Sequence, residues 1–374
     1  MNDYQTVMYT QLIDLVKSGD TFYFQDFILD GKIYRIFNYR LSAYTEFLKP
    51  SALECRGHTF EVDSNGNATR LVALPMEKFH NLGECPFTQN LDLTKIKSIQ
   101  YKADGSLIST YMHNGQLRLK SKGSLSSEQA IDSMNWLNLS QNTRFKQLLE
   151  EFTISGYTVN LEYVGPTNRI VLGYLEQDLI VLNARNITTG EYCSIQPFES
   201  LGHCIQQVNT NGLDLVEFVS SIPSMTESIE GFVVQLESGL RVKIKTDMYC
   251  SLHHTKDSIN NPRRLFECVL DEGADDLLSM FSTDELAVKQ ITTMQEIVKN
   301  LYNSLVVYVE KFHADNKHLD RKSYAIKGRA EIDPQMYFGL VMNLYLDKSN
   351  DYKEFCKKHY KEFGIKDEVT GDSE

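Results

Sequence analysis

The sequence predicts an α+β protein in which a sheet-rich domain, residues 1–254, is followed by an all-helical domain, residues 255–374. Between about residues 20 and 250, short alternating apolar and polar runs are broken by turn residues, as is typical of β-strands. After about residue 255, apolar residues recur at helical spacing instead. A chain of 374 residues is long enough for two domains of ordinary size.

Turns and strands dominate the first region. Polar segments rich in Asn and Gly predict hairpin turns at residues 63–67 and 113–115. Apolar alternation predicts later strands at residues 158–164, 179–183, 231–235 and 240–245. One helix is expected among them, beginning near Ser126, with Gln129 three residues later as its capping-box partner.

The second region has the pattern of amphipathic helices. One helical stripe consists of Ile291, Met294, Ile297, Leu301, Leu305 and Tyr308. Ser282 and Glu285 form a plausible capping box just before that stripe. Pro334 is expected at the first position of a further helix, which carries Leu340, Val341 and Leu344. We interpret these stripes as core packing.

The charge of the chain limits its partners. A net charge of −12 argues against a general nucleic-acid binder, because phosphate contacts need lysine and arginine. Six cations nevertheless cluster in a window whose only acid is Asp104, namely Lys95, Lys97, Lys102, Arg118, Lys120 and Lys122. The window allows a local cationic cleft on an acidic protein.

Cysteine usage and hydropathy indicate a cytoplasmic protein without a membrane partner. The seven cysteines are scattered and form no C-x-x-C pair, which fits reduced thiols better than disulfides or a zinc site. The amino terminus lacks the basic start and apolar run of a signal peptide. No apolar stretch approaches the roughly 20 residues that span a bilayer. We expect a monomer.

The segment around Lys102 is the most informative part of the sequence. Lys102 is followed by Asp104, Gly105 and Ser106 in the pattern K-x-D-G-S. Glycine permits a tight turn against which a nucleotide can lie closely. Partial burial and nearby cations favour the neutral amine of a lysine, which is the nucleophilic form. Taken alone, the pattern also fits an ordinary surface lysine before a turn.

Further lysines and two glutamates add to this pattern. Lys120 and Lys122 are two residues apart in a strand-like run, as are Lys243 and Lys245, so each pair is expected to share a face. The two pairs together indicate a phosphate-binding surface. Glu162 and Glu230 are embedded among apolar residues, where Mg²⁺, a ribose hydroxyl or a lysine would offset the cost of burying a carboxylate.

The order of these motifs resembles that of the covalent nucleotidyltransferases, the superfamily of ligases and capping enzymes. Within it, the sequence is most similar to the T-even phage RNA ligase 1 family. The match consists of Lys-x-Asp-Gly, Ser-Lys-Gly, a strand glutamate, Glu-Gly-Phe-Val-Val and Lys-x-Lys, at residues 102–105, 121–123, 162, 230–234 and 243–245. Residues 34–39, 53–57, 75–79 and 245–253 support it, and the resemblance extends from roughly residue 20 to beyond residue 340.

The resemblance implies an ATP-dependent RNA ligase. Lys102 would attack the α-phosphate of ATP and hold AMP, and Lys122 and Tyr249 match positions that the family needs for activity. Contacts to ATP fall on Tyr39, Arg56, Lys78, Asp104, Gly105, Glu162, Glu230, Lys243 and Lys245. Glu162 would receive the ribose hydroxyls, and Lys243 and Lys245 the phosphates. Glu230 would hold Mg²⁺, or Mn²⁺ in its place, through water. Asp275 matches a metal-associated acid, although helix capping or a solvated position explains it nearly as well.

By the same resemblance, the RNA partner would be a tRNA broken in its anticodon loop, recognised with help from the helical domain in the cytoplasm of a phage host. One departure is His80, which replaces a family aromatic residue and could still stack on a base. DNA ligases and capping enzymes usually place arginine where this chain has Leu107, which argues against both. A non-catalytic RNA- or nucleotide-binding module on the same scaffold is the alternative from another class.

Overall fold

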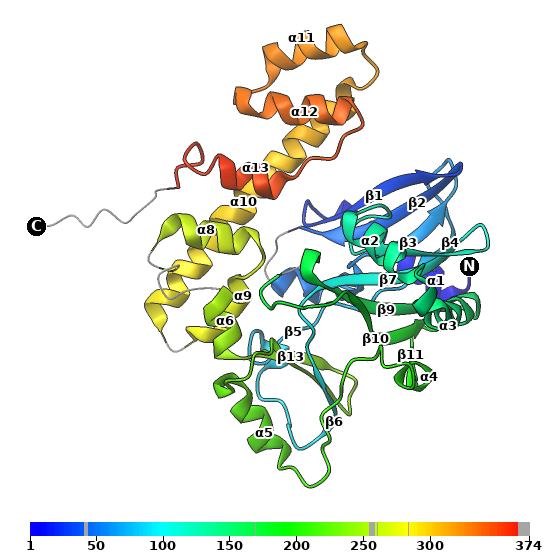
Figure 1. The fold of residues 1–374 in the computed structure, drawn as a ribbon. Coiled ribbons are helices and arrows are strands. Elements are labelled where there is room, and N and C mark those ends of the chain that lie inside the picture. Colours follow the sequence, from blue (N-terminus) through cyan, green and yellow to red (C-terminus); the bar gives the residue numbers. More distant parts are fainter. Residues whose placement is uncertain (41–43, 169, 254–258, 260, 283, 366–374) are drawn as a thin grey trace, which may run out of the picture. The chain divides into compact units, whose positions relative to one another are not determined.

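The computed structural model describes residues 1–374 except 41–43, 169, 254–258, 260, 283 and 366–374 (Figure 1). The chain divides into two compact units, Met1–His253 and His254–Glu374. Three sheets and their covering helices form the first unit, and helices alone form the described part of the second. The predicted α+β class, with a helical region after the sheets, is confirmed.

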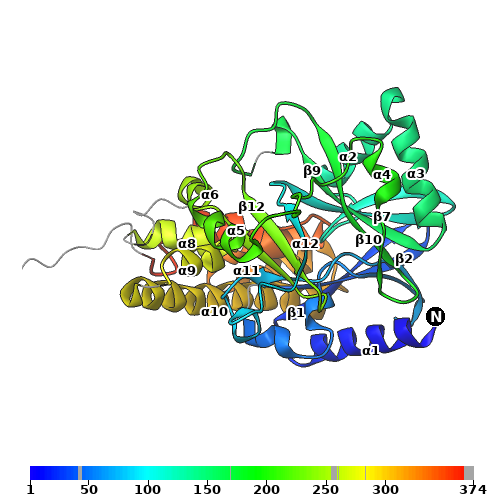
Figure 2. The same cartoon turned by 90° about the horizontal axis from the view of Figure 1, so that it is seen from below.

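Sheet A is the amino-terminal sheet, with strand order β1-β2-β3-β4 and antiparallel pairing throughout. Its strands are β1 (Phe22–Leu29), β2 (Lys32–Tyr39), β3 (Thr59–Val62) and β4 (Ala68–Ala73). Helix α1 (Asp3–Lys17) runs alongside this sheet and buries Met8 and Leu12 against it (Figure 2). The predicted turn at residues 63–67 is confirmed, because Asp63 accepts the backbone N–H groups of Asn65 and Asn67.

Sheet C is an antiparallel sheet with strand order β11-β10-β9-β7-β8. Its strands are β7 (Ser106–His113), β8 (Gln116–Ser121), β9 (Tyr157–Val164), β10 (Asp178–Asn186) and β11 (Tyr192–Cys193). Asn114 and Gly115 adopt positive φ between β7 and β8, so the predicted hairpin turn is confirmed. Three helices pack on one face of this sheet, namely α2 (Glu128–Leu137), α3 (Thr143–Ile154) and α4 (Gln196–Glu199) (Figure 1).

Sheet B carries the lysine motif and has strand order β5-β13-β12-β6. Its strands are β5 (His80–Asn81), β6 (Ile96–Tyr101), β12 (Gly231–Leu236) and β13 (Arg241–Lys245); only the β5–β13 pair is parallel. Phe232, Val234 and Val242 form a core with residues of α5 (Leu215–Ser221). Helix α6 (Asp247–His253) follows β13.

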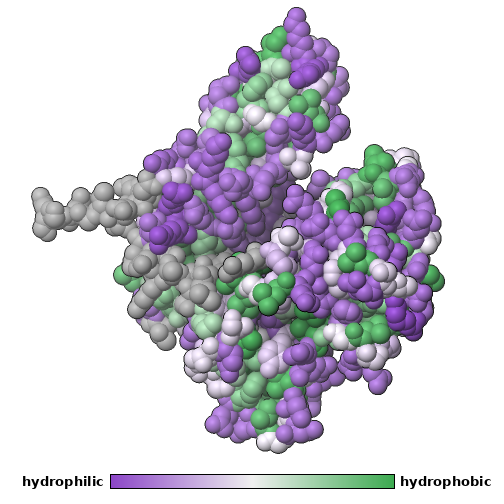
Figure 3. All heavy atoms as spheres, viewed as in Figure 1, coloured by the Kyte–Doolittle hydropathy of each residue, from purple (hydrophilic) through white to green (hydrophobic). Residues whose placement is uncertain are grey.

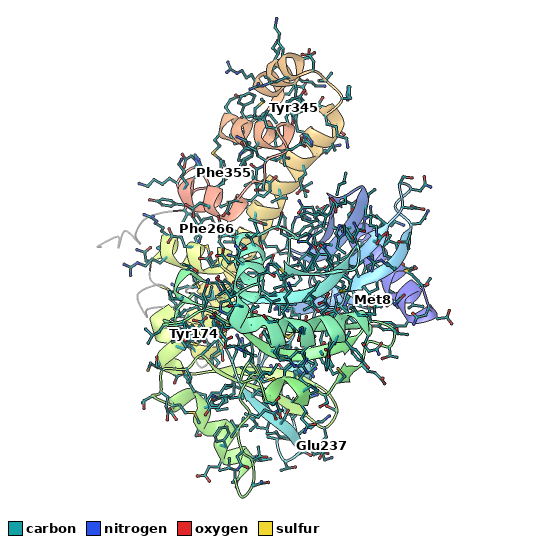
Figure 4. All side chains as sticks on the ribbon, turned by 45° about the vertical axis from the view of Figure 1, so that its right-hand side comes forward. Met8, Tyr174, Glu237, Phe266, Tyr345 and Phe355 are labelled. Carbon is teal, nitrogen blue, oxygen red and sulfur yellow. The ribbon has the colours of Figure 1, made fainter. Side chains whose placement is uncertain are left out.

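The second unit consists of helices around the long helix α10. The helices described are α8 (Pro262–Leu270), α9 (Ala274–Met280), α10 (Glu285–Asn316), α11 (Arg321–Glu331), α12 (Phe338–Tyr345) and α13 (Tyr352–Lys358). Phe266 of α8, Tyr345 of α12 and Phe355 of α13 are labelled in Figure 4. Helix α10 contacts α8, α9, α12 and α13, and its buried residues include Ile291, Met294, Val298 and Leu305.

Several predicted helix boundaries are wrong. Ser127, not Ser126, caps α2, because its side chain accepts the N–H of Ala130. Asp284, not Ser282, caps α10 by accepting two backbone N–H groups. Pro334 precedes a 3-10 turn, Gln335–Tyr337, and α12 begins only at Phe338. In each case an equally suitable capping residue or turn stands close by, and tertiary packing selects between them.

The expected apolar stripe of α10 is only partly buried, because Ile297 and Tyr308 remain exposed. On the face shown in Figure 3, hydrophilic residues are interspersed with hydrophobic ones in both units. Among the described residues, no helix is both long and apolar enough to cross a bilayer. None of the seven cysteines, all of which are described, forms a disulfide.

Candidate active site

Lys102 lies directly after β6, at the point where sheet B adjoins the loop 102–105. Because β6 pairs antiparallel with β12, the end of one strand lies beside the start of the other. The backbone N–H of Lys102 donates to the carbonyl of Gly231 at 2.9 Å, and its Nζ donates to Oε2 of Glu230 at 2.8 Å. The Lys102 side chain is 24% exposed, so solvent and a ligand can reach it.

Glu230 binds a second ammonium group. Its other oxygen, Oε1, lies 3.0 Å from Nζ of Lys245, because the register of β12 and β13 aligns Gly231 with Lys245. The Glu230 side chain is only 3% exposed, and a buried carboxylate needs such partners. Of the three partners considered from the sequence, lysine is therefore the one found here. Lys243 and Lys245 alternate with Val242 and Ile244, so their predicted shared face is confirmed.

Glu162 lies on β9, opposite Leu107 of β7, and faces the loop of residues 102–105, which we call the lysine loop. Its Oε1 accepts the backbone N–H of Gly105 at 3.1 Å. Desolvation raises the pKa of Glu162 to about 7, while the positive charge of Lys102 opposes the shift and the negative charge of Glu230 adds to it. Arg56 also lowers this pKa through its charge. The four side chains therefore share one electrostatic environment.

Gly105 is the residue that permits this approach. A Cβ atom at Gly105 would lie 2.3 Å from the carbonyl oxygen of Tyr163, which no side chain could tolerate without a shift of the backbone. The close contact between the lysine loop and β9 thus requires glycine at this position.

Asp104 holds the lysine loop from the protein side. Its Oδ2 accepts the backbone N–H groups of Val171 and Leu172 at 2.9 and 2.7 Å, and its Oδ1 accepts the hydroxyl of Tyr249 at 2.7 Å. Its own N–H donates to the hydroxyl of Tyr174. Both carboxylate oxygens of Asp104 are bonded to the chain itself, so Asp104 and Tyr249 position the loop.

A cluster of cations and aromatic rings lies at the end of β2. Nζ of Lys122 is 4.9 Å from the ring centre of Tyr39, and Nζ of Lys78 is 5.5 Å from the same ring. Phe47 packs edge-on against Tyr39 and is also contacted by Lys78. Such cation–π contacts orient both ammonium groups around one ring.

A pocket of about 270 Å³ borders Lys102 and Glu230. Its walls include Tyr101, Leu172, Tyr174, Ile180, Ile205 and Ile229. Ile180 is paired with Glu162 across β9 and β10, so the pocket lies beside Glu162 on the same face of sheet C. Asp178, Gln206 and Ser228 also line it, so apolar and polar walls meet beside two charged groups, which is the character of a small-ligand site.

Some residues selected from the sequence lie elsewhere. Lys120 is fully buried, and its Nζ donates to the carbonyls of Gly57 and Ser121, so the expectation that it shares a phosphate-binding face with Lys122 is wrong. Desolvation lowers the pKa of Lys120 to about 7. The cationic window of residues 95–122 is divided between sheets B and C.

His80 is buried among aromatic rings, and Asp275 belongs to the second unit. His80 is 1% exposed, packs edge-on against Phe47 and Phe87, and bonds to Glu84, so its ring is not available for stacking on a base. Asp275 lies in the first turn of α9 in the second unit. The described residues contain no cluster of three or more His, Cys, Asp or Glu that could hold a metal ion.

Sequence reasoning missed the residues that hold Asp104. Tyr174, Val171 and Leu172 lie about 70 residues from Asp104 along the chain, in the β9–β10 connection. No spacing rule links positions so far apart, because only the folded sheet brings them together. The sequence around Tyr174, which follows Gly173, has no motif that indicates a contact with Asp104.

Two family models match the chain. The model described as RNA ligase matches residues 54–249, which is more than half of the chain, and the model described as T4 RNA ligase 1, C-terminal domain, matches residues 256–366. A proposed RNA ligase of Thermovibrio ammonificans is 27% identical over 282 residues, which cover 73% of this chain and 72% of that protein.

The chain is also similar to RNA ligase 1 of bacteriophage TS2126, with 24% identity over 295 residues, which cover 74% of this chain and 70% of the relative. Among solved structures, an archaeal ATP-dependent RNA ligase gives a TM-score of 0.49 at 12% identity, covering 84% of this chain and 81% of the other.

Proposed function

The chain belongs to the T4 RNA ligase 1 family and is an RNA ligase, and from that premise we propose that it joins RNA ends with ATP through a covalent adenylate on Lys102. The family resemblance read from the sequence is thereby confirmed. The observation that carries the proposal is the pairing of Lys102 with Glu230, which also binds Lys245, beside the partly exposed Glu162 and a pocket of about 270 Å³.

In the first step, Nζ of Lys102 attacks the α-phosphorus of ATP. An N–P bond forms, the bond from the α-phosphorus to the bridging oxygen breaks, and pyrophosphate leaves. The attacking amine must first lose a proton, and Glu230, hydrogen-bonded to Nζ at 2.8 Å, is positioned to accept it. The base of ATP would occupy this pocket, and Glu162, which lies beside it, would receive the ribose hydroxyls.

The phosphates would lie against the cations of the first unit. Lys243 and Lys245 face the same side of sheet B. Lys78 and Lys122 lie beside Tyr39, and Arg56 completes the proposed set. In-line displacement at phosphorus depends mainly on positioning and charge neutralisation, which these side chains supply.

A divalent cation fits this arrangement. The carboxylates of Glu230 and Glu162 are hard oxygen donors, and the raised pKa of Glu162, caused by desolvation, marks a position where added positive charge is favourable. We propose that Glu230 holds Mg²⁺, or Mn²⁺, through water, and that Asp275 contributes to metal binding. The ion would neutralise charge on the phosphates and make the α-phosphorus more electrophilic.

In the second and third steps, AMP passes from Lys102 to a 5′-phosphate on RNA, and a 3′-hydroxyl then displaces AMP. We propose nicked tRNA as the RNA, a cytoplasmic location and a monomeric enzyme. The first domain, residues 1–254, would carry the adenylation chemistry, and the helical domain, residues 255–374, would take part in tRNA recognition.

The decisive test of the first step uses ATP labelled on the α-phosphate, Mg²⁺ and a denaturing gel. We expect label on the wild-type protein and none on Lys102→Ala, because the alanine variant lacks the nucleophile. The variant should still seal RNA that is already adenylated, since that step bypasses Lys102. An unlabelled but folded wild type would favour the binding-module alternative, and sealing of ordinary 5′-phosphate ends by Lys102→Ala would refute the assignment.

The tRNA proposal needs a separate comparison. Sealing of nicked tRNA and of a linear oligonucleotide would be measured with the full chain and with residues 1–253. We expect the shortened chain to lose the tRNA preference while it still forms the lysyl adenylate. Equal losses on both substrates would contradict a role of the helical domain in tRNA recognition.

A further inference from the structure

Four charged side chains outside the candidate active site form a continuous chain of ion pairs across the three sheets. Their order is Glu54, Arg185, Glu77 and Arg241, and we call this set the ion-pair chain. Glu54 precedes β3 of sheet A, Arg185 lies near the end of β10 in sheet C, and Arg241 begins β13 of sheet B. The proposed chemistry uses none of them.

Arg185 is the centre of the ion-pair chain. Its Nη1 and Nη2 donate to the two oxygens of Glu54 at 2.8 and 2.9 Å, which is a bidentate pair. Nη1 also donates to the carbonyl of Pro75 at 2.8 Å and lies 3.6 Å from Glu77, and Nε donates to the carbonyl of Gly190. The side chain is 4% exposed, so these contacts are shielded from water.

Glu77 continues the ion-pair chain toward sheet B. It accepts a hydrogen bond from Arg241 at 3.1 Å and another from the hydroxyl of Tyr192. The guanidinium of Arg241 lies 3.8 Å from the centre of the Tyr192 ring. Although burial raises the pKa of Glu54, hydrogen bonds from Arg185 and His58 bring that pKa below its usual value, so the carboxylate is charged.

The segments of Glu54, Glu77 and Arg241 each carry a cation proposed to bind ATP. Arg56 follows Glu54 by two residues and Lys78 follows Glu77 directly. Lys243 follows Arg241 by two residues on the same strand face. The two loops are also linked by their backbones, since Lys78 N–H donates to the carbonyl of Leu53 at 2.8 Å.

We propose that Arg185, through the ion-pair chain, is the positioning residue that fixes Arg56, Lys78 and Lys243 in register for the triphosphate of ATP. Well-packed apolar residues could stabilise the same junction equally well, so stability alone does not explain buried charges here. A bidentate guanidinium instead fixes distance and direction, which a phosphate-binding set assembled from three segments requires. The inference rests on the proposed ATP-dependent function.

The test replaces Arg185 with lysine, which keeps the charge and loses the bidentate geometry. Lysyl-AMP formation would be measured as a function of ATP concentration, together with sealing of pre-adenylated RNA and thermal unfolding. The matched control is Arg35→Lys, because Arg35 is 10% exposed and also forms a bidentate pair, with Asp26. Its further hydrogen bonds go to Tyr9 and Gly66, which are not proposed site residues.

For Arg185→Lys we expect the ATP concentration at half-maximal adenylation to rise roughly 10- to 100-fold, with a much smaller change in the maximal rate. Sealing of pre-adenylated RNA should change little, because it needs no triphosphate contact. Arg35→Lys should keep the ATP dependence of the wild type. A merely structural role would instead reduce both reactions in proportion to the folded fraction, in both variants.

If Arg185→Lys does not fold, Glu77→Gln serves as the second variant, since the amide keeps the shape and removes the charge between the two arginines. It should show the same rise in the ATP requirement. Unchanged ATP dependence in either folded variant, or failure of both to fold, overturns the positioning role. An unlabelled wild type would overturn the proposed function itself, so the two failures are distinguishable.

Discussion

Glu230 places a single buried carboxylate between two ammonium groups, and this arrangement defines the chemistry at the residue scale. Its two oxygens lie 2.8 Å from Lys102 and 3.0 Å from Lys245. Neutralising Glu230 would leave two neighbouring ammonium groups without the carboxylate that compensates them, so the three side chains act together. The reactive lysine is thereby held in place before any nucleotide arrives.

Replacing Glu230 by glutamine should lower the rate of lysyl-AMP formation by about 100-fold or more, because the amide cannot accept the proton of Lys102. Single-turnover labelling at saturating ATP measures this rate. The control is Glu237→Gln in the exposed turn of the same β12–β13 hairpin (Figure 4), which should label as the wild type does. Equal rates for the two variants would exclude Glu230 as proton acceptor.

Lys120 allows a prediction about pH. Desolvation lowers its pKa in the folded protein to about 7 from the ordinary lysine value of 10.5, so between these values the unfolded chain binds the extra proton. Stability should therefore rise with pH across this window, by at most roughly 4 kcal/mol. Thermal melts from pH 7 to 10 should show this rise in the wild type relative to Lys120→Met. The exposed Lys97→Met should leave the pH dependence unchanged.

At the scale of elements, a pattern is predictable from the sequence when residues that are close together in the sequence determine it. The turns at residues 63–67 and 113–115 and the alternation of Lys243 with Ile244 depend on neighbours in sequence. The burial of Lys120 does not, because the carbonyl of Gly57 that it binds lies 63 residues away in the chain, in the turn before β3 of sheet A. For the same reason, the ion-pair chain and the contacts of Asp104 had no sequence signal.

Two residues near the start of α10 are suitable caps, namely Ser282, expected from the sequence, and Asp284, found in the structure. Asp284→Ala should lower the stability of the helical unit by about 1 kcal/mol, because Asp284 accepts the N–H groups of Leu286 and Ala287. Ser282→Ala, at the cap expected from the sequence, should have no measurable effect. Chemical denaturation followed by circular dichroism compares the two; a larger loss from Ser282→Ala would contradict the assigned cap.

At the scale of the whole molecule, the side chains assigned to the adenylation step lie in Met1–His253, with the exception of Asp275. The order of the motifs, through the family resemblance, predicted that most of these side chains belong to the first domain. The packing of three sheets into one unit was not predictable from the sequence. The first unit has its own cores, in sheets A, B and C.

A chain of residues 1–253 should therefore form lysyl-AMP when ATP and Mg²⁺ are supplied. If Asp275 takes part in metal binding, the shortened chain and the full-length Asp275→Asn variant should both need more Mg²⁺ for half-maximal labelling. Titration of Mg²⁺ at fixed ATP measures this, with Asp271→Asn in the same unit as the control. Identical titrations for all proteins would exclude Asp275 from metal binding and leave it as an acidic residue in the first turn of α9.

The hydrogen bond from Tyr249 to Asp104 also has a consequence for synthesis of the protein. The partners are 145 residues apart, so a chain emerging from the ribosome presents Lys102 long before Tyr249 exists to hold its loop. Partly made chains should not consume ATP, because the loop of Lys102 gains its hydrogen bond to Tyr249 only after β13 and α6 have been made and have folded. If the gene is split between codons 104 and 249, each of the two protein fragments should accordingly be inactive alone. Their reassembly could then be measured as RNA ligation.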